Sequence, residues 1–325
     1  FFNMAQIYKD LLYLDMKNII TLIALFIFGI LSGQTTWTKN IHRNESSRFL
    51  SVEQTMDGGY IAAGYDYGYN NNNFEYMKTP YVLRLDSQSN VLWADSINSG
   101  LSARYYGQPI KINQTADGGF VYTYNFYLTS GPNGNPNDFS RGCNLKKLDS
   151  SGNTSWLRSY LGINTFIFTA GSADWSNGVK QTFDGGYCMI GLDRAGLNNN
   201  GPQSPFLFKT DDIGDSTWAV TFDFQRGKIE SFEQTKDSGY VLAGYAIVSS
   251  FGITPQEKDF WIIKTDINGD TLWTKMFGGT NEDVLNSVQE TIDGGYIVAG
   301  STESIGNGGK DIYLSKIDSI GNIKW

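Results

Sequence analysis

The chain has 325 residues, of which 40% are hydrophobic and 18% are charged, and its formal net charge is −8 at pH 7. This length can bury a substantial core, and a negative charge without any basic run argues against a nucleic-acid partner. The 37 glycines, 20 phenylalanines and 19 tyrosines favour many short strands joined by glycine turns over a helical protein.

The N-terminal part has the pattern of a targeting segment. Residues 1–15 precede a plausible start at Met16, and we interpret them as an upstream segment. Residues 16–33 combine one lysine, an apolar run and two small residues, which is typical of a secretory signal peptide, with a retained anchor as the alternative. The run is short for a membrane span, which needs roughly 20 apolar residues. We therefore expect a secreted or outer-surface protein whose mature chain, residues 34–325, has no membrane span.

A hairpin pattern occurs five times in the mature chain. Its form is Thr-x-Asp-Gly-Gly-aromatic, with one serine in place of a glycine, and its last copy lies in "ETIDGGYIVAG". Glycines at the turn centre allow a positive φ, the aspartate can accept hydrogen bonds from nearby backbone N–H groups, and the aromatic residue starts the next strand. The turn aspartates are Asp57, Asp117, Asp184, Asp237 and Asp293.

A tryptophan recurs with a similar period. It ends segments such as "WIIKTDINGDTLW", in which a third strand leads through a tight turn into a fourth strand. Each repeat is therefore expected to hold four antiparallel strands. The recurring tryptophans are Trp37, Trp93, Trp156, Trp218, Trp273 and Trp325.

Four-stranded units of about 40 to 60 residues that repeat around an axis form β-propellers. We predict an all-β propeller with its tryptophans between the blades; a chain of small sandwiches or a solenoid is the alternative. The expected units are 37–93, 93–156, 156–218, 218–273 and 273–325. The chain has six tryptophan segments but five sets of the first three strands, so Trp37 has no blade of its own, and the last repeat stops at Trp325. We therefore expect further blades, about six to eight in all. For the present chain we expect an open or imperfectly closed ring.

These motifs resemble those of the secreted bacterial DGGY-repeat (delta-60-like) propeller proteins, many of which end in a type IX secretion sorting domain. The resemblance covers residues 37–325 and implies export, without implying an activity. The tryptophan turn is also similar to the docking motif of quinoprotein propellers, which concerns blade packing and does not imply a quinone. A weaker likeness links "DDIGDSTW" to the Asp box of sialidases, which is itself a structural turn.

Few residues suggest metal or nucleophilic chemistry. The only histidine, His42, is expected on a surface loop, which disfavours His-based triads and His-rich metal sites. Cys188 stands where other repeats have isoleucine or valine, so we expect it to be buried and not paired with Cys143. "DINGDT", residues 266–271, is interpreted as a turn capped by its own aspartate rather than a calcium loop. We expect no metal and no cofactor.

A glycosidase needs only two carboxylates, one as the proton donor and one as the nucleophile or base. Acids that recur in every repeat are interpreted as structural, because a propeller has one active site on its axis. These include Asp86, Asp149, Asp211, Asp266 and Asp318, each of which lies two residues after a basic residue. The better candidates do not recur; they are Asp66, Glu75, Asp193, Glu233, Glu282, Asp283 and Glu303. None of them is singled out as catalytic.

The segments that follow the second strand differ most between repeats, and in a propeller they would share one face. The richest surrounds the asparagine run at residues 70–73, where aromatic rings and amides suit sugars or peptides, although loops that tolerate insertions explain the variation equally well. The candidate binding residues are Tyr65, Tyr67, Tyr69, Phe74 and Tyr76.

The leading hypothesis from the sequence is a secreted, non-enzymatic propeller that serves as an adhesion or interaction scaffold, with a polysaccharide or a surface protein as its partner. The alternatives are a carbohydrate-active hydrolase, endoglucanase-like, that uses axial Asp or Glu residues, and a quinoprotein-like redox propeller. Two carboxylates about 5 to 10 Å apart in an axial pocket would favour the hydrolase.

Overall fold

The computed structural model describes Ile41 and residues 47–70, 75–96, 103–104, 111–128, 140–161, 173–194, 203–222, 226–248 and 257–325. Residues 1–42 form a unit of their own, and the fold concerns residues 43–325. The proposed signal peptide, Trp37 and His42 lie outside the described residues. Within the described ranges every regular element is a strand, and no helix there could cross a membrane.

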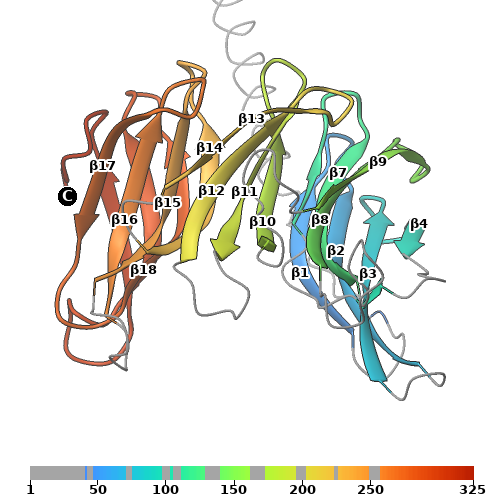
Figure 1. Ribbon diagram of the computed structural model, residues 1–325, viewed down its shortest axis with the longest axis horizontal. Coiled ribbons are helices and arrows are strands. Elements are labelled where there is room, and N and C mark those ends of the chain that lie inside the picture. The colour runs from blue at the N-terminus through green and yellow to red at the C-terminus, as the bar shows by residue number, and fades with distance from the viewer. Residues whose placement is uncertain are drawn as a thin grey trace, which may run out of the picture. The chain divides into compact units, whose positions relative to one another are not determined.

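Five antiparallel sheets follow one another along the chain (Figure 1). The first holds β1 (Ser47–Gln54), β2 (Tyr60–Asn70), β3 (Glu75–Leu85) and β4 (Val91–Ser96). The second holds β5 (Ala103–Arg104) and β6 (Ile112–Gln114), which both pair with β7 (Phe120–Leu128), then β8 (Ser140–Leu148) and β9 (Thr154–Leu161). The third holds β10 (Ala173–Gln181), β11 (Tyr187–Arg194), β12 (Gln203–Thr210) and β13 (Ser216–Thr221).

The last two sheets repeat the same order. The fourth holds β14 (Gly227–Gln234), β15 (Tyr240–Ile247), β16 (Lys258–Thr265) and β17 (Thr271–Phe277). The fifth holds β18 (Asp283–Glu290), β19 (Tyr296–Thr302) and β20 (Asp311–Ile317), and Ile323 pairs with Ile317 where a fourth strand would lie. The five sheets are the blades of a five-bladed β-propeller, which confirms the predicted all-β class and the four-strand repeat. The expected total of six to eight blades stays a prediction.

Tight turns join the first and second strands of each sheet. In the first sheet, Thr55 N donates to Gly59 O at 2.9 Å and Gly58 N donates to Thr55 O at 2.8 Å. Gly58 has a φ of +82°, and the serine that replaces glycine in the fourth repeat, Ser238, has a φ of +67°. The positive φ that the sequence pattern predicts is therefore confirmed.

The first sheet differs from expectation in the length of its middle strands. β2 and β3 have 11 residues each and pair as far as Asn70 with Glu75, so the variable segment predicted around the asparagine run is a paired strand at residues 65–70 and 75–80 rather than a loop. Tyrosines at 65, 67 and 69 alternate with smaller or polar residues, and this period of two is typical of a strand. The two strands therefore continue as a paired hairpin through these residues.

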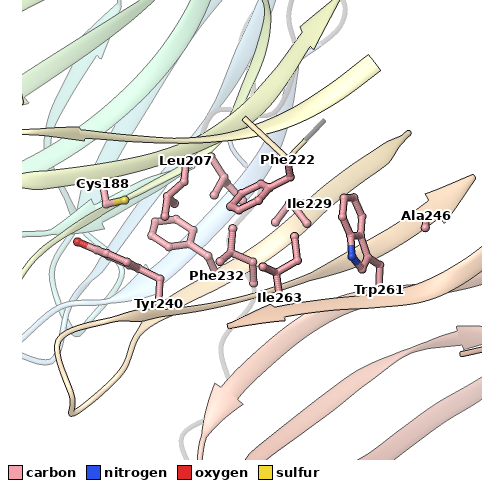
Figure 2. Close-up of a cluster of buried hydrophobic side chains, with 11 residues drawn as sticks. Cys188, Leu207, Phe222, Ile229, Phe232, Tyr240, Ala246, Trp261 and Ile263 are labelled. Atoms are coloured by element: carbon pink, nitrogen blue, oxygen red, sulfur yellow. The ribbon is translucent and has the colours of Figure 1, made fainter. Parts of the chain in front are cut away.

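The hydrophobic core is divided into clusters between consecutive sheets. Figure 2 shows the cluster between the third and fourth sheets, where Cys188 and Leu207 face Phe232 and Tyr240. Cys188 is fully buried and forms no disulfide bond with Cys143, which confirms its interpretation as a small buried hydrophobe. Burial of one such large side chain contributes roughly 1.5 to 3 kcal/mol, so these clusters supply much of the stability.

Each junction between sheets joins the tryptophan of one repeat to the aromatic residue of the next. Trp218 meets Tyr240 edge to face, with ring centroids 5.9 Å apart, and packs on the turn at Gly269. A backbone N–H also crosses the junction, as where Phe183 N donates to Gln234 Oε1 at 2.7 Å. The equivalent ring pairs are Trp93–Phe120, Trp156–Tyr187 and Trp273–Tyr296. The predicted position of these four tryptophans between blades is confirmed.

Candidate active site

The repeated hairpin aspartates are held in ion pairs that support the turns. Asp237 accepts hydrogen bonds from Thr235 Oγ1, from Gly239 N at 3.0 Å and from Lys264 Nζ at 3.1 Å. Burial raises the pKa of Asp237, but the hydrogen bonds from Thr235 and Lys264 outweigh this effect and hold the pKa below its ordinary value. The equivalent pairs are Asp57–Arg84, Asp117–Lys147, Asp184–Lys209 and Asp293–Lys316. Because every repeat uses this pair, we interpret the aspartates as parts of the turns rather than as a site.

The second turn of each repeat is also structural. Asp266 Oδ1 accepts hydrogen bonds from Asn268 N and Asp270 N, both at 2.9 Å, which confirms a turn capped by its own aspartate. A hollow of about 370 Å³ lies at the first junction, lined by Trp93 and by the ion pair of the neighbouring hairpin turn. Since residues of the repeat line this hollow, we interpret it as part of the blade packing rather than as a site.

The predicted aromatic surface is only partly described. Tyr65 is buried, with 6% of its surface exposed, and so belongs to the packing of the first sheet. The side chains of Tyr67, Tyr69 and Tyr76 and the whole of Phe74 lie outside the described part of the structure. A binding role for these four residues stays a prediction.

The predicted acids that do not recur have different surroundings. Three of them lie in pairs or hydrogen bonds near the surface: Glu233 Oε2 accepts from Glu290 N at 2.8 Å, Glu282 pairs with Lys258 at 2.6 Å, and Glu303 pairs with Lys310 at 3.4 Å. The side chains of Asp66, Glu75 and Asp193 are not among those described. The remaining acid, Asp283, is the one that the structure places in an unusual environment.

Asp283 is fully buried at the start of β18. It lies opposite Thr302 in the register of β18 and β19, and its Oδ1 accepts a hydrogen bond from Thr302 Oγ1 at 2.5 Å. Its Oδ2 accepts a second hydrogen bond, from Gly279 N at 2.9 Å. Each oxygen of this buried carboxylate therefore has a hydrogen-bond donor.

Asp259 lies beside Asp283 but has the opposite environment. A bridge between Lys258 and Glu282 sets the start of β16 alongside the start of β18, so the next residue of each strand is an aspartate. Asp259 Oδ1 is buried and accepts no hydrogen bond from the described residues. Burial raises the pKa of Asp259 above its ordinary value, and the negative charges of Asp283 and Glu257 raise it further.

Gly278 keeps the space between the two carboxylates free of a side chain. A Cβ placed on Gly278 would lie 2.5 Å from Asp259 Oδ1 and 2.8 Å from Asp283 Oδ2. The separation of these two oxygens therefore cannot exceed the sum of the two distances. Two like carboxylates thus lie side by side in different surroundings, since both oxygens of Asp283 accept hydrogen bonds and Asp259 Oδ1 accepts none from the described residues.

The sequence made Asp283 one of seven candidate acids, without preferring it, and gave no sign of Asp259. Asp259 precedes the apolar run "FWII", which is typical of a polar residue at the start of a buried strand. Its pairing with Asp283 depends on β16 and β18 lying side by side, although 24 positions separate the two residues in the chain. The doublet Gly278-Gly279, which lies shortly before Asp283 in the chain, was an available signal, since paired glycines mark a close approach of the backbone.

Comparison with known proteins is limited to structure. No family model and no curated protein matches the chain. The α-L-arabinofuranosidase of Fusarium graminearum, solved with arabinobiose, is similar with a TM-score of 0.54 and 9% identity over 85% of this chain and 79% of that chain. A mutant of the NanB sialidase of Streptococcus pneumoniae is similar with a TM-score of 0.52 and 8% identity over 91% of this chain and 64% of that chain.

These structural neighbours correct the leading hypothesis from the sequence. We expected a non-enzymatic adhesion or interaction scaffold, whereas the similar solved structures reported above are an arabinofuranosidase and a sialidase. These structures contradict that expectation, and the hydrolase alternative is taken up as a proposal below. At such low identity the likeness establishes a shared fold, and the chemistry has to be argued from the Asp259–Asp283 pair.

Proposed function

We propose that the protein is a carbohydrate-active hydrolase whose chemistry is carried by Asp259 and Asp283. The single observation that supports it most is the contrast between two adjacent carboxylates, one supplied with donors and one with a raised pKa. Glycoside hydrolysis needs this division of roles, because one group must be protonated and the other ionised at the same pH.

In this proposal Asp259 is the proton donor and Asp283 is the second carboxylate. Asp259 holds its proton to a higher pH than an ordinary aspartate and gives it to the oxygen of the leaving sugar. Asp283, held in place by Thr302 and Gly279, supplies the negative charge on the other side of the scissile bond. The bound on the separation of Asp259 Oδ1 and Asp283 Oδ2 lies below the roughly 6.5 to 9.5 Å that leaves room for a water between the two groups. We therefore expect Asp283 to bond to the anomeric carbon as the protonated leaving sugar departs. Water, which gives a proton back to Asp259, then cleaves this ester, so configuration is retained.

The substrates to test first follow from the proteins that share the fold. Purified protein should be incubated with arabinan, an aryl α-L-arabinofuranoside and a sialoside, and released sugar measured. We expect product from at least one of them, and we expect Asp259→Asn and Asp283→Asn each to lower kcat by about 100-fold or more. Asp212→Asn changes an exposed acid of the third sheet and serves as the control, with activity unchanged.

A stability measurement separates a functional pair from a structural one. The folded pKa of Asp259 is raised, so its contribution to stability is present below the unfolded pKa and is lost as pH rises through the folded pKa. At pH 7 the neutral Asp259→Asn variant should therefore be more stable than the parent, by about 2 to 4 °C in Tm for each 1 kcal/mol gained. Lost activity with unchanged or higher Tm supports the proposal; glycosidase activity that survives both substitutions contradicts it.

We propose further that this activity is extracellular. The support is the pattern of residues 16–33 and the resemblance of the repeats to exported propeller proteins. Cleavage after the small residues near position 33, seen by N-terminal sequencing of the secreted protein, is the expected result. Retention of the segment in an active protein would contradict this part.

A further inference from the structure

The first strands of the sheets line the centre of the propeller, because those of successive sheets contact one another. Two positions on these strands depart from the repeat and bring lysine to the centre. Three residues before the end of the strand, the second sheet has Lys111 and the third has Gly178 where the remaining sheets have serine: Ser51, Ser231 and Ser287. One residue before the end, the third sheet has Lys180 where the others have a glutamate or an amide: Glu53, Asn113, Glu233 and Gln289.

Lys111 reaches from the second sheet past the third sheet to the fourth. Its Nζ donates a hydrogen bond to the backbone oxygen of Glu230 at 2.9 Å. A Cβ placed on Gly178 would lie 3.3 Å from Lys111 Cδ, so the serine of the other repeats would crowd the lysine at this point. Glycine in one sheet thus makes room for lysine from the sheet before it. An ammonium group has three donors, and the described residues account for one of them.

Two further lysines lie close to Lys111. Lys180 Nζ lies 5.9 Å from the centre of the Phe232 ring. Lys228 Nζ lies 2.8 Å from Glu230 Oε1. Burial lowers the pKa of Lys111 most, and the charge of Glu230 opposes this effect. The positive charges of Lys180 and Lys228 lower the pKa of Lys111 further, so the three ammonium groups lie within electrostatic range of one another.

The nearby carboxylates do not neutralise this cluster. One glutamate, Glu230, is paired with Lys228. Burial raises the pKa of the other, Glu53, and a backbone hydrogen bond and the charge of Lys180 partly offset this effect. Three lysines thus face two glutamates, and Lys111 and Lys180 form no ion pair within the described part of the chain. All three lysines are partly exposed, so a ligand can reach them.

We propose that Lys111, Lys180 and Lys228 bind the anionic group of an acidic sugar, either a carboxylate or a sulfate. Ammonium groups donate charge-assisted hydrogen bonds to such oxygens, and the excess positive charge attracts the anion. The proposal rests on the carbohydrate-active function proposed above and names its substrate class. Each lysine comes from a sheet that has a neighbour on both sides in this chain, so the cluster does not depend on the first or the last sheet.

Lys228 lies near the Asp259–Asp283 pair along the fourth sheet. Gly227, the residue before Lys228, is in register with Ala246, which is in register with Asp259. Neighbouring strands are about 4.8 Å apart, so the backbones of Gly227 and Asp259 lie about 10 Å apart. A sugar held by the lysines can therefore belong to the same oligosaccharide as the sugar at the carboxylate pair.

Isothermal titration calorimetry tests the proposal in the Asp259→Asn/Asp283→Asn double variant, which should bind sugars without cleaving them. The probes are an oligogalacturonate, a sulfated galacto-oligosaccharide and the neutral galacto-oligosaccharide of the same length. We expect at least one acidic probe to bind roughly tenfold or more tightly than the neutral probe, and the acidic probe that binds identifies the anion. Since the whole protein has a net charge of −8, the rest of its surface repels acidic sugars, and binding reports on the cluster.

Lysine variants in the same background connect binding to the cluster. Lys180→Met and Lys111→Met should each weaken binding of the acidic probe by roughly tenfold and leave the neutral probe unaffected. Lys275→Met, at an exposed lysine of the fourth sheet outside the cluster, is the matched control and should change nothing. Circular dichroism confirms that each variant is folded, and Asp259→Asn alone replaces the double variant if that does not fold.

The possible results separate this inference from the proposed function. Equal affinity for acidic and neutral probes, no binding of either acidic probe, or acidic binding that both lysine variants leave intact would overturn the inference. Cleavage of a neutral sugar by the parent protein, without binding of acidic probes, would leave the proposed function standing alone. Binding of an acidic probe that depends on the lysines, without cleavage of any sugar by the parent protein, would instead support the anion site and contradict the hydrolase.

Discussion

Gly269 offers the sharpest test of how tryptophans join the blades. Its φ is +85°, and a Cβ placed on it would lie 2.8 Å from Trp218 Cζ3 and 2.9 Å from Val220 Cγ2. Gly118 has nearly the same backbone, with a φ of +79°, but no atom lies within 4 Å of its Cβ position. Alanine therefore meets the same backbone strain at both sites and meets an indole ring only at Gly269.

The expected loss of stability follows from these two terms. The left-handed conformation costs an alanine roughly 1 kcal/mol at either site. Crowding in a packed interface adds about 1 to 3 kcal/mol at Gly269 alone. We expect Gly269→Ala to lower the free energy of unfolding by about 2 to 4 kcal/mol and Gly118→Ala by about 1 kcal/mol.

Urea unfolding followed by circular dichroism measures both losses. The same pair of substitutions in a Trp218→Leu background forms a double-mutant cycle, which isolates the contact between the methyl group and the indole. The extra cost at Gly269 should shrink in that background. Equal losses for Gly269→Ala and Gly118→Ala in the parent would refute the view that the indole is packed against this turn.

Three other predictions concern the repeats and the cysteines. Hydrogen bonds from the threonine and the glycine of its own turn lower the pKa of Asp57 to about 2, so the stability it contributes above the unfolded pKa should be lost as pH falls from about 4 towards 2 in an acid titration followed by circular dichroism. Lys264→Met should cost about 1 to 2 kcal/mol in urea unfolding, since the lysine is buried while its partner Asp237 is largely exposed, and no loss would contradict a supporting role. Cys143 and Cys188 should not react with a thiol reagent until the protein unfolds, because both are buried and burial raises the pKa of Cys188.

The fold could be predicted because its signals are local and repeated. A turn that needs a positive φ selects glycine, and the same turn recurs in every repeat with a tryptophan at a fixed place, so four strands per blade follow from the pattern. The ion pairs could not be predicted, because their two partners are far apart in the sequence and meet only when the strands pair. Arg84 lies 27 positions from Asp57, and only the pairing of β3 with β2 brings the guanidinium to the turn.

The site was less predictable than the fold. Asp283 was a candidate because it does not recur, yet nothing in the sequence distinguishes it from Glu282 or Glu303. The partner Asp259 belongs to another sheet, and its role depends on a missing donor, which is a property of the folded surroundings and not of the residue. The repeated turns and tryptophans can be recognised in the sequence, whereas Asp259 and Asp283 do not recur and so leave no pattern there.

The most direct test of the carboxylate pair is the titration of Asp259 itself, followed by carbon-13 NMR of the labelled carboxyl group with Asp259→Asn as the assignment control. We expect the pKa of Asp259 to lie above that of an ordinary aspartate and to fall in Asp283→Asn, because that substitution removes the neighbouring negative charge. A pKa of Asp259 at or below the ordinary value, or one that Asp283→Asn leaves unchanged, would contradict the proposed division between proton donor and charged partner.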